Sequence, residues 1–129
     1  MDKKVIMAVD DDADNNFSFK LRLEKLDPSY GVVTVGSGRK CLELLENHEI
    51  PDIILMDIMM PGANGWETYQ KIKENSAWKN IPVIFVSASS DELAQRIKNI
   101  LGDDYIEKPY DIEFVKKRID DILGKISQN

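Results

Sequence analysis

The sequence predicts an α/β fold in which a doubly wound, five-stranded parallel sheet is covered by helices on both faces, a (βα)5 arrangement. Three observations carry this prediction. The chain of 129 residues alternates five short apolar runs with five amphipathic stretches, which is typical of repeated strand–helix units with parallel strands. The apolar runs are continuous, so we expect strands buried on both faces. Pro and Gly residues separate several of the runs.

Five apolar runs are the predicted strands. The first ends abruptly at three aspartates, the second is β-branched and bounded by glycines, and the third follows Pro51. The fifth is short and is stopped by Lys108-Pro109. In chain order, the predicted strands are Val5–Val9, Val32–Val35, Ile53–Met56, Val83–Val86 and Tyr105–Ile106.

Each predicted strand is followed by apolar residues at helical spacing. Pro28 stops the first helix, Ser37 can cap the second, and the turn-forming segment 61–65 precedes the third. We expect the apolar residues of the second helix to face inward. The residues that mark the five helices are Phe19, Leu23 and Leu26; Leu42 and Leu45; Trp66, Tyr69 and Ile72; Leu93, Ile97 and Ile100; and Val115, Ile119, Ile122 and Ile126.

Composition and charge exclude several classes of protein. The chain has 17 basic and 23 acidic residues and a net charge of -6, which argues against a nucleic-acid-binding surface. Cys41 is the only cysteine, so an intramolecular disulfide and a cysteine-based zinc site are excluded. No apolar stretch is long enough for a transmembrane helix, and none resembles a signal peptide. We therefore expect a cytoplasmic protein with one domain over residues 1–129.

Polar side chains follow four of the five predicted strands. Asp10–Asp12 follow the first, Asp57 the third, Ser87 the fourth and Lys108 the fifth. Ligands of open α/β sheets bind beyond the carboxyl ends of the strands. Crowded carboxylates repel one another unless a cation joins them, and Mg²⁺ prefers such oxygen ligands. An aspartate nucleophile, Mg²⁺, a lysine and a hydroxyl together predict a phosphoryl-transfer site. Asp12 or Asp14 is the better candidate for capping the next helix.

Four motifs in this order resemble the receiver domain of response regulators, the CheY-like superfamily, over essentially the whole chain. They are Val9-Asp10-Asp11, residues 57–65, Ser87-Ala88 and Lys108-Pro109. The resemblance implies the flavodoxin-like strand order 2-1-3-4-5 and a receiver domain over 1–129 without an output domain in this chain. Asn64 stands where the family usually has aspartate, and the segment before Tyr105 is one residue short.

The resemblance also implies a role for each matching residue at the metal site. Asp57 would be the phosphoacceptor and a metal ligand. Asp11 would bind Mg²⁺ directly, Asp10 would act mainly through water, and the main-chain carbonyl of Met59 would be a further ligand. Mn²⁺ would be a substitute for Mg²⁺.

Three further residues would act on the phosphoryl group or respond to it. By the same resemblance, Ser87 and Lys108 would contact the phosphoryl oxygens, and Tyr105 would be the switch aromatic that rotates inward when Ser87 moves. Phosphorylation adds negative charge and strong acceptor oxygens. The resemblance therefore implies a switch on the surface of the fourth helix, the fifth strand and the fifth helix.

The implied function is that of a phosphorylatable module of a two-component phosphorelay. The donor would be the phosphohistidine of a histidine kinase or phosphotransfer protein, and the domain would slowly dephosphorylate itself without acting as an enzyme on other substrates. We expect a downstream protein partner, no direct contact with nucleic acid or membrane, and a monomer or a weak phosphorylation-dependent dimer.

Two alternatives remain at this point. The first is a receiver-like adaptor that works without phosphorylation, although such modules commonly lack one of the site residues that this sequence keeps. The second is a haloacid-dehalogenase-type phosphatase, which uses a D-x-D-x-[TV] pattern after its first strand. Asp10 to Asp14 offer the D-x-D but fail at the fifth position, and the chain is short for that class.

Overall fold

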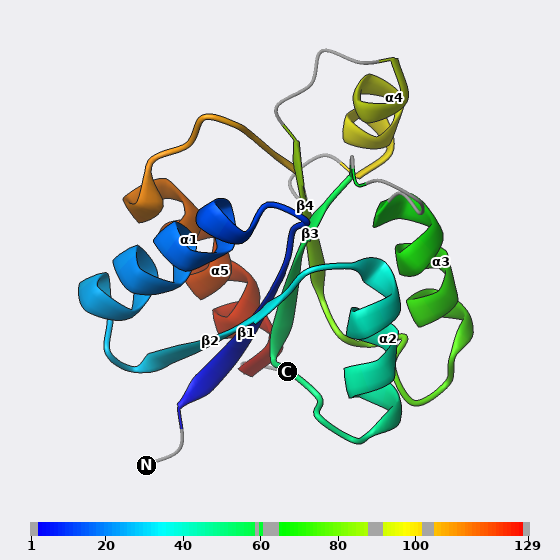
Figure 1. The fold of residues 1–129 in the computed structure, drawn as a ribbon, viewed down its shortest axis with the longest axis horizontal. Coiled ribbons are helices and arrows are strands. Elements are labelled where there is room, and N and C mark those ends of the chain that lie inside the picture. The colour runs from blue at the N-terminus through cyan, green and yellow to red at the C-terminus, as the bar shows by residue number, and fades with distance from the viewer. Residues whose placement is uncertain (1–2, 59, 61–64, 88–91, 102–104, 128–129) are drawn as a thin grey trace.

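The computed structural model describes residues 3–58, 60, 65–87, 92–101 and 105–127. Within these residues, five strands and five helices alternate along the chain (Figure 1). The strands are β1 (Lys4–Val9), β2 (Tyr30–Val35), β3 (Ile53–Asp57), β4 (Val83–Ser87) and β5 (Tyr105–Glu107). The helices are α1 (Ala13–Leu26), α2 (Gly38–Glu46), α3 (Gly65–Glu74), α4 (Glu92–Leu101) and α5 (Ile112–Ser127). The predicted alternation is confirmed.

The strands form one parallel sheet in the order β2-β1-β3-β4-β5. β1 is therefore an interior strand. β2 pairs with it on one side, and after β2 the chain crosses over so that β3 pairs with β1 on the other side. Ligands of such sheets bind where the strand order reverses. This places the expected site at the carboxyl ends of β1 and β3, and it confirms the predicted strand order.

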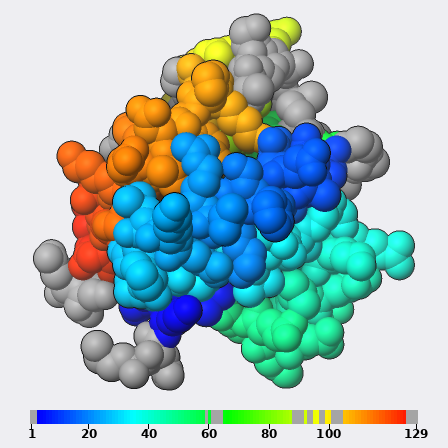
Figure 2. Space-filling view, turned by 60° about the vertical axis from the view of Figure 1, so that its left-hand side comes forward, coloured from blue at the N-terminus to red at the C-terminus, as the bar shows by residue number. Residues whose placement is uncertain are grey.

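Helices cover both faces of the sheet. In Figure 1, α1 and α5 lie on one face, and α2 and α3 lie on the other. Figure 2 shows the first of these faces, where α1 lies beside α5. Successive strand residues point to opposite faces, so Ile6 and Ala8 pack with α1 and α5, whereas Met7 and Val9 pack with α2 and α3. The continuous apolar runs are explained by burial on both sides.

Some apolar residues of the predicted helices are not part of the core. Leu26, the last residue of α1, is 39% exposed. Ile100 of α4 is 70% exposed. On α2, Cys41 and Leu45 are buried and Leu42 is half-buried. No helix among the described residues is long and apolar enough to cross a membrane.

Candidate functional site

Asp12 is the aspartate that begins α1. Its carboxylate accepts hydrogen bonds from the backbone N–H groups of Asp14 at 2.9 Å and Asn15 at 3.2 Å, which are donors without partners inside the helix. The capping role that the sequence left open between Asp12 and Asp14 therefore belongs to Asp12. Asp10 and Asp11, which directly follow β1, do not cap this helix and are available to bind a cation.

Three carboxylates meet where the strand order reverses. Asp10, Asp11 and Asp57 each offer a carboxylate oxygen, and these oxygens lie within 4.8 Å of one another. Asp10 and Asp57 are half-buried and Asp11 is exposed. An all-oxygen set at this spacing fits a hard divalent cation such as Mg²⁺, which commonly keeps several water ligands. Met59, expected to add its carbonyl, lies outside the described residues.

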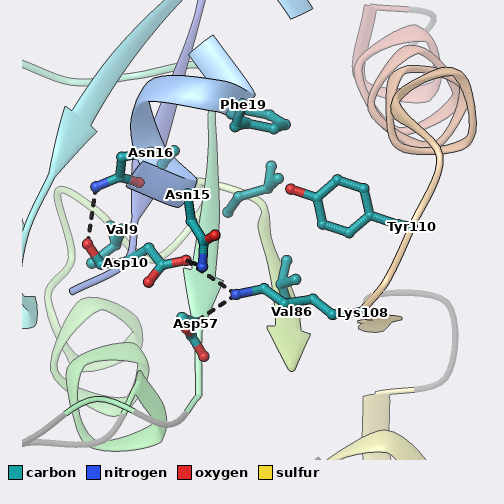
Figure 3. Close-up of a pocket in the computed structure, with 11 residues that line it drawn as sticks. Val9, Asp10, Asn15, Asn16, Phe19, Asp57, Val86, Lys108 and Tyr110 are labelled. Carbon is teal, nitrogen blue, oxygen red and sulfur yellow. Dashed lines mark hydrogen bonds and ion pairs between the residues drawn. The ribbon is translucent and has the colours of Figure 1, made fainter. Parts of the chain in front are cut away.

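Lys108 reaches into this cluster from the end of β5 (Figure 3). Its Nζ lies 3.1 Å from Oδ2 of Asp10 and 3.4 Å from Oδ2 of Asp57. Burial by itself would lower the pKa of Lys108, but the negative charges of Asp57 and Asp10 outweigh burial and raise this pKa above its usual value. Lys108 is therefore a fixed positive charge beside Asp57.

Backbone hydrogen bonds fix the relative positions of β3, β4 and β5 at this edge. Asp57 is the register partner of Val86, and the N–H of Lys108 donates to the carbonyl of Ser87 at 2.9 Å. Ser87 is buried and is the last residue of β4. Since side chains alternate along a strand, Ser87 points away from the face to which Val86 points. Ala88 lies outside the described residues.

Tyr105 is buried in the core cluster on the α2 and α3 face. Its hydroxyl has no hydrogen-bond partner among the described residues, although the side chain is only 6% exposed. An unpaired buried hydroxyl is unfavourable. The residue expected to act as the switch aromatic is therefore packed inward.

Two residues that the sequence analysis did not single out also belong to this site. Asn16 and Tyr110 line a cavity of about 30 Å³ beside Asp10, Asp57 and Lys108 (Figure 3). Burial raises the pKa of Tyr110. Tyr110 directly follows Lys108-Pro109, which is a signal that could have pointed to it. Asn16 is one of several polar residues at the start of α1, and nothing in the pattern distinguishes it.

The fold and the carboxyl edge of the sheet define the CheY-like class of α/β domains. A family model described as the response regulator receiver domain matches residues 6–120. The chain therefore belongs to this family. Receiver domains are signalling modules of two-component systems, and their partners are histidine kinases or phosphotransfer proteins.

Relatives and solved structures agree with this family. A probable transcriptional regulator ycf27 of Guillardia theta is 34% identical over 98% of this chain and 48% of its own length. The response regulator ArlR of Staphylococcus aureus is 35% identical over 95% of this chain and 54% of its own length. The N-terminal domain of a response regulator receiver protein from Methanoculleus marisnigri superposes with a TM-score of 0.69 at 34% identity, covering 92% of this chain and 95% of that one.

The chain spans about half the length of these two curated relatives. A probable cyclic di-GMP phosphodiesterase of Vibrio cholerae is 35% identical over 88% of this chain, but the match covers 25% of that protein. Most of that protein therefore lies outside the part that resembles this chain.

Proposed function

We propose that this receiver domain accepts a phosphoryl group on Asp57 from the phosphohistidine of a histidine kinase or phosphotransfer protein, and that it slowly removes this group by hydrolysis. The observation that carries the proposal is the meeting of Asp57 with Asp10, Asp11 and Lys108. Three carboxylate oxygens lie within 4.8 Å of one another, and the lysine amine is 3.4 Å from Asp57.

The chemistry needs a nucleophile and compensation of negative charge. An oxygen of Asp57 forms a bond to phosphorus while the bond from phosphorus to the donor's imidazole nitrogen breaks, and the imidazole leaves with the electron pair of that bond. Asp10 and Asp11, with the carbonyl of Met59, would hold Mg²⁺ or Mn²⁺. The ion, when bound, neutralises phosphoryl oxygens and orients them. Lys108 supplies a further positive charge beside Asp57.

The same residues suggest how phosphorylation is communicated. Lys108 is paired with Asp10 and Asp57, and a phosphoryl group on Asp57 adds charge and acceptor oxygens for Lys108 and for the hydroxyl of Ser87. We expect a change at Ser87 to reach β5, because Glu107 of β5 is the register partner of Ser87. Tyr105 lies two residues before Glu107 and therefore on the same face of that strand. We therefore expect the surface of α4, β5 and α5 to change and to bind a downstream protein.

The cellular setting belongs to the same proposal. We place the domain in the cytoplasm, where its donor kinase domain resides, without direct binding to nucleic acid or membrane. It acts as a monomer or as a weak dimer that forms on phosphorylation. Beyond its own phosphorylation and dephosphorylation it catalyses no reaction.

Labelling with acetyl phosphate and Mg²⁺ tests the proposal, with incorporation measured by intact-protein mass spectrometry and Phos-tag electrophoresis. We expect one phosphoryl group per wild-type chain and none on Asp57→Asn. Asp12→Asn is the matched control, because it removes a neighbouring carboxylate but keeps a good helix cap. We expect Asp12→Asn to be labelled like the wild type.

Three results would contradict the proposal. Labelling of Asp57→Asn at the wild-type level would show that another residue accepts the phosphoryl group. A wild-type protein that neither labels nor binds Mg²⁺ would instead favour an adaptor that works without phosphorylation. Turnover of a generic phosphate ester that survives Asp57→Asn would favour a phosphatase of the haloacid-dehalogenase type.

A further inference from the structure

Asn16 is a buried polar residue in the first turns of α1. It is 8% exposed, and its side-chain amide donates two hydrogen bonds to backbone carbonyls. One, drawn in Figure 3, goes to the carbonyl of Asp10 at 2.9 Å, and the other goes to the carbonyl of Val35, at the end of β2, at 3.2 Å. Both amide hydrogens are therefore used.

These hydrogen bonds lie just beyond the last residue of β1 that is paired in the sheet. The last register partners of β1 are Val9 with Val35 and Val9 with Met56. One residue later, the N–H of Asp10 donates to the carbonyl of Val35 at 3.0 Å, and the carbonyl of Asp10 accepts from Asn16. Both backbone polar groups of Asp10 are thus held, so the peptide that joins Asp10 to Asp11 cannot rotate without breaking a part-buried hydrogen bond.

A fixed peptide at this position matters because carboxylates at close range repel one another. If the peptide between Asp10 and Asp11 could rotate, the carboxylates would move apart, and a cation would have to bring them back together. We propose that Asn16 is a positioning residue of the cation site, which holds Asp10 and Asp11 so that their carboxylates stay beside Asp57. This inference rests on the proposed function, because it assumes that the three carboxylates bind Mg²⁺.

Asn16 is better placed for this role than its neighbour. The amide of Asn15 lies 3.5 Å from Oδ2 of Asp10, and Asn15 is exposed. It reaches only the carboxylate of Asp10 and not the backbone, and it does so at a long distance for a hydrogen bond. Asn16 holds the backbone from which two of the carboxylates extend.

The experiment compares Mg²⁺ binding with stability in the apo protein. Mg²⁺ titrations of wild type, Asn16→Ala and Asn16→Ser are followed by calorimetry and by the fluorescence of Trp66, and the free energy of unfolding is measured with urea in EDTA. Leu23→Ala is the matched control, since Leu23 is a fully buried residue of α1 whose side chain packs in the core. We expect Asn16→Ala to raise the Mg²⁺ dissociation constant about tenfold, as is usual for partners of metal ligands.

The other variants decide between positioning and general stability. Leu23→Ala should lose more stability than Asn16→Ala and keep the wild-type Mg²⁺ affinity at a temperature where it is folded. Asn16→Ser keeps one donor, so its Mg²⁺ dissociation constant should lie between those of wild type and Asn16→Ala. If Asn16→Ala does not fold, the comparison of Asn16→Ser with wild type tests the inference by itself. Wild-type Mg²⁺ affinity in Asn16→Ala, or in Asn16→Ser, would overturn the inference and leave the proposed function intact. No Mg²⁺ binding by the wild type would overturn both.

Discussion

The backbone of Gly65, the first residue of α3, lies directly against the carbonyl group of Asp57. Its N–H donates to the carbonyl of Ile58 at 2.8 Å. A Cβ atom at Gly65 would overlap the carbonyl oxygen of Asp57 and would lie 2.8 Å from Cγ of Met56. The first residue of α3 is therefore in close contact with Asp57, which we propose carries the phosphoryl group. Only a residue without a side chain permits this close approach.

Gly65→Ala should be destabilising, because a backbone carbonyl cannot move aside as the end of a flexible side chain can. We expect a loss of about 1–3 kcal/mol in the free energy of unfolding and slower labelling of Asp57 by acetyl phosphate. Gly124→Ala is the control, since a Cβ there meets nothing within 4 Å and alanine favours a helix. It should gain about 0.5–1 kcal/mol. Equal effects of both substitutions in urea denaturation would contradict this account.

Lys108 competes with a divalent cation for the same carboxylates, because its amine lies 3.1 Å from Asp10 and 3.4 Å from Asp57. We expect Lys108→Met to bind Mg²⁺ about fivefold more tightly, which corresponds to about 1 kcal/mol. The same variant should be labelled by acetyl phosphate about 100-fold more slowly, because a charge aimed at the phosphoryl oxygens is gone.

Lys116→Met controls for the change in net charge in calorimetric Mg²⁺ titrations. Lys116 also bridges two carboxylates, with Nζ 3.4 Å from Asp27 and 2.6 Å from Asp120. Its carboxylate partners are not those of the cation site, so Lys116→Met should leave Mg²⁺ affinity and labelling unchanged. Weaker Mg²⁺ binding in Lys108→Met would show that Lys108 does not compete for the site.

Two buried tyrosines allow a matched test of the unpaired hydroxyl. Tyr105 and Tyr30 are 6% and 5% exposed, but the hydroxyl of Tyr30 donates to the carboxylate of Asp120, whereas that of Tyr105 has no partner among the described residues. We expect Tyr105→Phe to raise the free energy of unfolding by about 1 kcal/mol and Tyr30→Phe to lower it by about 1–2 kcal/mol. Thermal and urea denaturation without phosphorylation measure both. A loss of stability in Tyr105→Phe would reveal a partner for its hydroxyl.

Side chains of α1 occupy the outward-facing backbone groups of the edge strand β2 at Val32. The carboxylate of Glu24 accepts from the N–H of Val32 at 2.8 Å, and the amine of Lys20 donates to the carbonyl of Val32 at 2.7 Å and to Glu24 at 2.9 Å. The hydrogen bond from Val32, with Lys20 in addition, lowers the pKa of Glu24 below its reference value of 4.5. Edge strands protected in this way are poor templates for pairing with other chains.

The stability that Glu24 contributes should depend on pH in a defined direction. Because the pKa of Glu24 is lower in the folded protein than in the unfolded chain, its contribution is complete above pH 4.5 and is lost as the pH falls through the folded value. We expect Glu24→Gln to cost about 1 kcal/mol at pH 7 and progressively less below pH 4.5. The measurement is urea denaturation between pH 3 and pH 7.

Glu92→Gln is the control, since the Glu92–Arg96 pair has the same spacing but is exposed. It should change the free energy of unfolding by less than about 0.5 kcal/mol at every pH. A difference between wild type and Glu24→Gln that grows toward low pH would contradict the assignment.

The local pattern of the sequence was sufficient for the strands, the helices and the residues that follow the strands, whereas the strand order was implied by the family resemblance. Continuous apolar runs of strand length are typical of a parallel sheet buried on both faces, and parallel strands bring their carboxyl ends to one edge. Asp10, Asp57 and Lys108, which are distant in the chain, were therefore predicted to meet, and they do. The role of Met59 stays a prediction, because that residue lies outside the described part of the chain.

Only the tertiary structure decided which polar residue performs which task. The sequence offers Asp10, Asp11, Asp12 and Asp14 within five positions, and the path of the chain into α1 makes Asp12 the cap. The partners of Asn16 and Glu24 are backbone groups of Val35 and Val32 on β2, many residues away. Because nearly every residue has both a backbone carbonyl and an N–H, hydrogen bonds to these groups cannot be predicted from the pattern of side chains. Sequence alone thus determined the fold and the place of the acidic site, whereas the contacts that hold its backbone were decided by packing.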